Sequence, residues 1–147
     1  MRLAIGTLFI ALTILFSLWR GGAPERLFAL ILMSMYGIDR IGHLIIAVGA
    51  QAALDALPLA IDSSAMIAIV AVMVLARRFW PICAASFQML SLASHVVRLT
   101  DQGLPPLASA ILGIAPSYLV CLTVLVGTIC HTHRMRTKGS DPAWRSS

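Results

Sequence analysis

The sequence predicts an all-α protein, an integral membrane bundle of about five transmembrane helices. Three observations lead to this fold class. The 147 residues are 59% hydrophobic and only 12% charged, whereas a soluble domain is about 50% apolar and about 25% charged. The mean hydropathy is +0.91. Long apolar runs follow one another with short connectors between them, and most Arg and Lys residues lie in these connectors or near the C-terminus.

Five apolar runs are candidates for membrane-spanning helices, each of which needs about 20 residues. They lie near residues 3–19, 27–48, 57–76, 79–97 and 107–130. The second run could continue toward residue 54, and the third is short unless it begins at Leu57 instead of Ser63. A four-span bundle, with the third segment lying in the membrane interface, is therefore the alternative.

The positions of the cationic residues predict how the chain is threaded. Cytoplasmic loops are enriched in Lys and Arg, and the connectors at 20–26 and 77–78 are basic, as is the segment 131–147. We therefore expect a transmembrane domain at 1–130 and a short basic cytoplasmic tail at 131–147, with the N-terminus outside and the C-terminus inside. The outer side then holds the acidic residues Asp55, Asp62 and Asp101.

The formal charge of +5 does not indicate a nucleic-acid partner. The basic residues form short clusters between apolar runs, which is typical of membrane topology and contact with anionic headgroups. The expected partners are the lipid bilayer and, within it, a second copy of the chain or a larger membrane protein.

Two predicted spans carry polar residues at helical spacing. Offsets of three or four residues place side chains on one face of a helix. The second span has Tyr36, Asp39, Arg40 and His43, and the fourth has Gln88, Ser91, His95 and Arg98. Charged groups deep in a bilayer cost several kcal/mol, so these residues are candidates for function.

These two polar stripes reach similar depths when counted from the inner ends of their helices, at about 1.5 Å per residue. We therefore expect the second and fourth spans to face each other in the outer half of the bundle. Asp39 would neutralise Arg98 or Arg40, with His43 and His95 alongside. Such a cluster could join helices, at about 0.6 kcal/mol per contact on average, or line a water-filled or ligand-bearing cavity.

His43 and His95 also allow a second reading, as axial ligands of haem b, because such ligation needs two imidazoles at matched depth on different helices. A metal site that adds Asp39 lacks a spacing as specific as H-E-x-x-H. The expectation is that no cofactor is bound, and haem b is the alternative.

The fifth span contains small residues at every fourth position, namely Ser109, Gly113 and Ser117. This spacing allows another helix to approach closely. The approaching helix could belong to the same chain or to a second copy. Pro116 lies within this face and is expected to bend the helix.

Several short runs resemble those of small hydrophobic membrane proteins of alphaproteobacteria. They are Arg20-Gly21-Gly22, Pro24-Glu25-Arg26, Arg78-Phe79-Trp80-Pro81, Pro116-Ser117-Tyr118-Leu119 and Asp141-Pro142-Ala143-Trp144-Arg145. The resemblance implies a location in a bacterial inner membrane. It implies no activity and assigns no catalytic or binding residue.

The function predicted from the sequence is a non-enzymatic accessory or scaffold role within the membrane. The chain has no nucleophile elbow, phosphate-binding loop or paired catalytic carboxylates, so no catalytic residue is predicted. Two alternatives belong to other classes. One is a b-type haem protein that transfers electrons, and the other is a small proton-linked transporter that uses the buried polar cluster.

Overall fold

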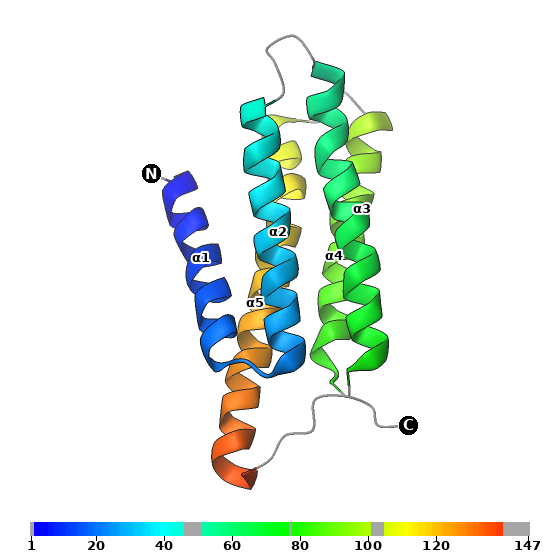
Figure 1. The fold of residues 1–147 in the computed structure, drawn as a ribbon. Coiled ribbons are helices and arrows are strands. Elements are labelled where there is room, and N and C mark those ends of the chain that lie inside the picture. Colours follow the sequence, from blue (N-terminus) through cyan, green and yellow to red (C-terminus); the bar gives the residue numbers. More distant parts are fainter. Residues whose placement is uncertain (1, 46–50, 77, 101–104, 140–147) are drawn as a thin grey trace.

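The computed structural model describes residues 2–45, 51–76, 78–100 and 105–139. These residues form five helices and no strand (Figure 1). The helices are α1 (Arg2–Arg20), α2 (Ala23–Ile45), α3 (Gln51–Leu75), α4 (Trp80–Thr100) and α5 (Pro106–Lys138). The all-helical prediction is therefore confirmed for the described part of the chain.

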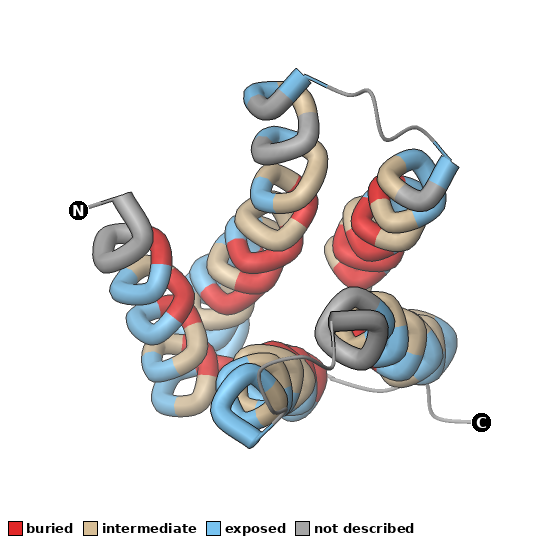
Figure 2. The backbone as a smooth tube through the Cα atoms, turned by 90° about the horizontal axis from the view of Figure 1, so that it is seen from above, coloured by how far each residue is buried: buried red, intermediate tan, exposed pale blue. Residues whose placement is uncertain are grey.

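The helices run alternately down and up (Figure 1), and their contacts close into a ring. Each helix packs against the next one along the chain, while α1 also packs against α5 and α2 contacts α5. In the view along the helices, buried residues lie on the sides that face the interior (Figure 2). The backbones of α2 and α4 do not pack against each other within the described residues. These two helices are separated by the interior of the ring.

The ends of the helices follow from local sequence. α1 and α2 are joined by Gly21 and Gly22, and the Gly21 amide donates to the Ser17 carbonyl at 2.9 Å. A side chain at Gly21 would overlap that carbonyl, so this tight connection requires glycine. α5 ends at Gly139, which has a φ of 69° and donates its amide to the Met135 carbonyl at 3.2 Å. Glycine is the residue best suited to this left-handed cap.

The structure differs from the sequence prediction at two helices. α3 begins at Gln51 and contains Pro58 in its interior, so it is longer than the predicted third span. Asp62 consequently lies in the middle of α3 instead of at its outer end. α5 continues past Cys130 to Lys138, so the start of the predicted basic tail is helical. Asp101 and the side chain of Asp55 lie outside the described residues.

Three helical segments are long and apolar enough to cross a membrane, namely Ala23–Ile45, Ala56–Leu75 and Ile111–Lys138. A shorter apolar segment spans Gly6–Arg20 in α1. Large apolar side chains also point outward, and Leu44 is 85% exposed. An outer surface of this kind is expected where lipid replaces water as the solvent. The coarser prediction, a helical bundle with segments able to span a membrane, is thus supported.

One half of the bundle has a closely packed interior. This half lies toward the Gly21–Gly22 turn, and its core contains Phe28, Ile69 and Val124, all fully buried. The Phe28 ring meets the Trp80 ring at a centroid distance of 4.6 Å. Two polar contacts tie the same half together. Trp80 Nε1 donates to Glu25 Oε1 at 3.2 Å, and the hydroxyls of Ser17 and Thr128 are 3.0 Å apart.

Candidate functional site: a polar cavity lined by all five helices

The other half of the bundle contains a partly open cavity of about 310 Å³. Every helix contributes to its wall. The polar residues of the wall are Thr7 from α1; Tyr36, Asp39 and Arg40 from α2; Asp62 from α3; Gln88, Ser91, His95 and Arg98 from α4; and Ser117 and Tyr118 from α5. Apolar residues, among them Ile10, Leu32 and Ile61, complete the lining.

The polar residues lie at matched depth within the bundle. At about 1.5 Å per residue, Asp39 is roughly 24 Å along α2 from Ala23, and His95 is roughly 22 Å along α4 from Trp80. Asp62 is roughly 20 Å from Leu75, at the same end of α3. The cavity therefore lies in the half opposite the Gly21–Gly22 turn.

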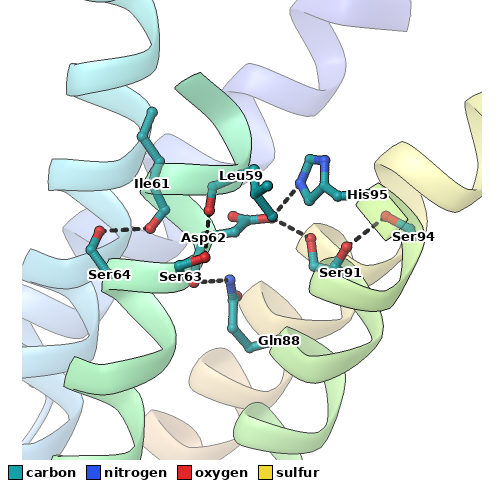
Figure 3. Close-up of polar contacts among 9 residues, drawn as sticks. All are labelled: Leu59, Ile61, Asp62, Ser63, Ser64, Gln88, Ser91, Ser94 and His95. Atoms are coloured by element: carbon teal, nitrogen blue, oxygen red, sulfur yellow. Dashed lines mark hydrogen bonds and ion pairs between the residues drawn. The ribbon is translucent and has the colours of Figure 1, made fainter. Parts of the chain in front are cut away.

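Asp62 is the centre of a hydrogen-bond network that joins α3 to α4 (Figure 3). Its Oδ2 accepts a hydrogen bond from Ser91 Oγ at 2.6 Å and lies 2.9 Å from His95 Nε2. Gln88 Nε2 donates to the backbone carbonyl of Asp62 at 3.3 Å, and Ser94 Oγ donates to the Ser91 carbonyl at 2.6 Å. The side chains of His95 and Asp62 are only 16% and 14% exposed.

The local sequence of α3 explains how Asp62 reaches the interior. Ile61, Ala65 and Ile69 are buried at intervals of four residues, so they mark the inward face of the helix. Asp62 lies at the edge of this face. The neighbouring Ser63 and Ser64 satisfy their hydroxyls on carbonyls of their own helix, at 2.7 Å and 2.8 Å. They can therefore lie on an apolar helix without partners from other helices.

The arrangement of Asp62, Ser91 and His95 is not that of a catalytic triad. In a triad the histidine lies between the serine and the carboxylate and takes the proton from the serine. Here Ser91 and His95 both bind the same carboxylate oxygen. The network holds a carboxylate and an imidazole together at the cavity wall, which suits the binding of a proton or a polar solute.

The structure brings most of the residues singled out in the sequence to one cavity. Tyr36, Asp39, Arg40, Gln88, Ser91, His95 and Arg98 all line it. The polar faces of α2 and α4 thus look onto the same space, although the two helices do not pack together. The carboxylate that meets the α4 residues is Asp62, which the sequence analysis had placed outside the cluster.

His43 lies outside the cavity lining. Its side chain is 53% exposed, and its Nδ1 is 2.8 Å from the Asp39 carbonyl and 3.6 Å from Asp39 Oδ1. His43 is not among the residues that line the cavity, whereas His95 is. The two predicted haem ligands therefore do not both line this cavity. In the described part of the chain, no group of three or more His, Cys, Asp or Glu residues is arranged to hold a metal ion.

The small residues of α5 also face inward. Gly113 and Ser117 line the cavity, while the side chain of Ser109 lies outside the described residues. A methyl group at Gly113 would overlap the guanidinium of Arg98. The close approach that this glycine permits is therefore made by a side chain of α4 in the same chain. A methyl group at Gly6 would likewise overlap the hydroxyl of Tyr118.

Comparison with known proteins finds no match among protein-family models, curated proteins or solved structures.

Proposed function

We propose that this protein is a small proton-linked carrier that holds a polar solute in the cavity between its five helices. The observation that carries the proposal is the Asp62–Ser91–His95 network in the wall of that cavity. Ionisable side chains inside a membrane protein are costly, and they typically mark solute pathways and proton relays. The transporter was one of the alternatives left open by the sequence.

The proposal treats all five helices as membrane spans in a bacterial inner membrane. α1 and α4 lie in the same ring as the three span-length helices and help to line the cavity. Basic residues gather at the end away from the cavity, namely Arg20, Arg26, Arg78, Arg136 and Lys138. By the positive-inside rule this end faces the cytoplasm. The N-terminus is then outside and the C-terminus inside.

The proton link rests on His95. Imidazole is the side chain whose charge normally changes between pH 5 and pH 8. The Asp62 carboxylate lies 2.9 Å from its Nε2. A proton taken up here alters the charge of the cavity wall at the point where a solute would bind. Solute binding and proton binding are therefore coupled.

The two halves of the bundle suit a carrier that takes its solute from the outer side. The cavity occupies the outer half, and the apolar core around Phe28, Ile69 and Val124 closes the inner half. Release to the cytoplasm then requires the inner contacts, such as the Ser17–Thr128 hydrogen bond, to open.

An accessory role within the membrane is the second candidate. It is favoured by the small amount of chain outside the helices and by outward-facing apolar residues such as Leu44 and Ile67. That role would use the outer surface of the bundle, and it gives the Asp62 network only a structural purpose. The two candidates are therefore separated by whether the cavity has a ligand.

The test is proton movement in proteoliposomes loaded with the pH-sensitive dye pyranine. Succinate, glutamate, alanine, glucose and choline are added outside in turn. We expect at least one solute to acidify the lumen in the presence of the wild-type protein. His95→Gln should abolish this response, whereas His43→Gln, at an exposed position outside the cavity lining, should retain it. If no solute moves protons beyond the level of protein-free liposomes, the carrier proposal fails.

A further inference from the structure

We infer that Trp80 is the inner gate of the carrier. Its indole closes the interior of the bundle on the cytoplasmic side of the cavity, and Glu25 holds the indole in the closed position. This inference rests on the proposed function, since it names the residues that must move when a solute is released to the cytoplasm. Three features support it: the position of the indole, its contacts with two other helices and the incomplete hydrogen bonding of Glu25.

Trp80 lies where the interior of the bundle would otherwise stay open. It is the first residue of α4, at the end of the bundle away from the cavity. At about 1.5 Å per residue, it is roughly 12 Å from Gln88, the nearest cavity residue on this helix. In the described part of the chain α2 and α4 do not pack against each other. The space between them is the cavity in the outer half, whereas in the inner half the indole of Trp80 extends across it to α2.

The indole contacts two helices besides its own. Its Nε1 donates to Glu25 Oε1 of α2 at 3.2 Å, and its ring meets the Phe28 ring edge-on at a centroid distance of 4.6 Å. On the other side the indole lies against Gly127 of α5, where an added methyl group would be 2.8 Å from two of its carbons and 2.9 Å from Nε1. One side chain therefore joins α4 to α2 and α5, and its movement would break all of these contacts together.

Trp80 is better placed to move than the other members of the inner core. Phe28, Ile69 and Val124 are fully buried inside their helices, so each could move only by displacing its neighbours. Trp80 is only partly buried and lies in the first turn of its helix. Its side chain can leave the interior without unfolding α4, and Phe28 then loses the ring that covers it on the α4 side.

Glu25 holds Trp80 with an incomplete set of hydrogen bonds. Its side chain is fully buried, and its Oε2 has no hydrogen-bond partner within the described residues. A buried polar atom without a partner costs free energy and can act as a store of strain. Opening of the inner half would admit water to Oε2 and recover part of that cost. The closed state therefore requires less free energy to open than its apolar contacts alone would demand.

Cys121 is a native reporter of this opening. It is fully buried in the inner core, beside Val120 of the cavity lining. The other two cysteines, Cys83 and Cys130, are partly buried and exposed, and both are replaced by serine so that only Cys121 can react. Its modification by N-ethylmaleimide is timed by mass spectrometry, with the full-length protein in mild detergent. The reaction should be slow, because the thiol is reached only when the core opens.

Three substitutions at the gate should accelerate the modification. Trp80→Phe removes the N–H donor but keeps an aromatic ring, and should raise the rate by roughly threefold, as for an average polar contact between membrane helices. Gly127→Ala displaces the indole and Trp80→Ala removes it, so each should raise the rate by roughly tenfold or more.

Two controls test whether these effects belong to the gate. Phe79→Ala removes the neighbouring aromatic ring, which is 76% exposed. Gly37→Ala adds a methyl group that has no atom within 4 Å. Both should leave the rate of Cys121 modification as it is in the parent protein.

Solute dependence separates a gate from a merely structural tryptophan. The modification is repeated with succinate, glutamate, alanine, glucose and choline. A solute that acidifies the liposome lumen should change the rate in the parent protein, because binding shifts the carrier between its open and closed states. In Trp80→Ala, where the gate is absent, the same solute should leave the rate unchanged.

The inference is overturned if Trp80→Phe and Gly127→Ala react like the two controls, or if the solute changes the rate equally with and without Trp80. Its failure is distinguishable from failure of the carrier proposal. Proton movement with a solute, together with equal rates in all variants, would retain the carrier and exclude Trp80 as its gate. Faster modification in the gate variants without any solute-driven proton movement would retain Trp80 as the closure of the inner half and exclude the carrier.

Discussion

Asp62→Ala removes the carboxylate that joins α3 to α4. The wild-type oxygen Oδ2 lies 2.6 Å from Ser91 Oγ and 2.9 Å from His95 Nε2. Polar contacts between membrane helices contribute about 0.6 kcal/mol on average and up to about 1.7 kcal/mol. Two such contacts are lost, so we expect Asp62→Ala to lower the free energy of unfolding by roughly 1–3 kcal/mol.

A double-mutant cycle isolates the Asp62–His95 contact from the other effects of each substitution. The wild type, Asp62→Ala, His95→Ala and the double variant are unfolded in mixed micelles of fixed composition, at a pH near 7. Because the pair is short and mostly buried, with exposures of 14% and 16%, we expect a coupling energy near the upper value, about 1–2 kcal/mol.

The matched control is the cycle of Asp39→Ala with His95→Ala. Asp39 is the carboxylate that the sequence analysis assigned to this cluster, but its close neighbour in the structure is His43. The coupling energy between Asp39 and His95 should be no larger than about 0.5 kcal/mol, the usual deviation from additivity for residues that do not interact. A larger coupling for Asp39 than for Asp62 would refute the network described here, as would additivity of Asp62→Ala and His95→Ala.

Three further predictions concern packing. Gly37→Ala meets open space and should raise stability in detergent by about 0.5–1 kcal/mol through helix propensity. Gly113→Ala should gain less, because its methyl group displaces the Arg98 guanidinium. Equal effects of the two substitutions would contradict the contact between Gly113 and Arg98. Phe28→Ala, at a fully buried position, should cost roughly 3–5 kcal/mol in an unfolding titration, and a loss below 1 kcal/mol would show that the inner half is not closely packed. Thr128→Val should cost about 0.6 kcal/mol in the same titration through loss of its contact with Ser17, and Ser17→Ala should then cause no further loss.

Much of the fold could be predicted because the helices follow the apolar runs. Glycine and proline mark breaks between helices. Gly21 and Gly22 therefore predict the turn after α1, and Pro106 predicts the start of α5. The length of α3 could not be predicted from its apolar residues. Pro58 and the polar run that begins at Asp62 interrupt its hydrophobicity, yet neighbouring helices allow the helix to continue through them.

The candidate site was predicted in part. The stripe of Gln88, Ser91, His95 and Arg98 was identified from spacing alone, and all four residues line the cavity. Asp62 was missed because composition placed it at a helix end. The signal that could have found it is its position beside the buried face marked by Ile61, Ala65 and Ile69. Which carboxylate meets His95 depends on the packing of α3 against α4, and the pattern within one helix does not determine that.

The length of α5 gives the cavity a mechanical connection to the opposite end of the molecule. The helix forms the cavity wall at Gly113, continues without a break past the buried Pro116, and projects beyond the other helices as far as Lys138 (Figure 1). At about 1.5 Å per residue, this arm is roughly 37 Å long. Proline removes one backbone hydrogen bond and is a natural pivot. A tilt of about 5° at that pivot would move the end of the arm by roughly 3 Å, and it would have to disrupt the packing of Val124 and the Ser17–Thr128 contact.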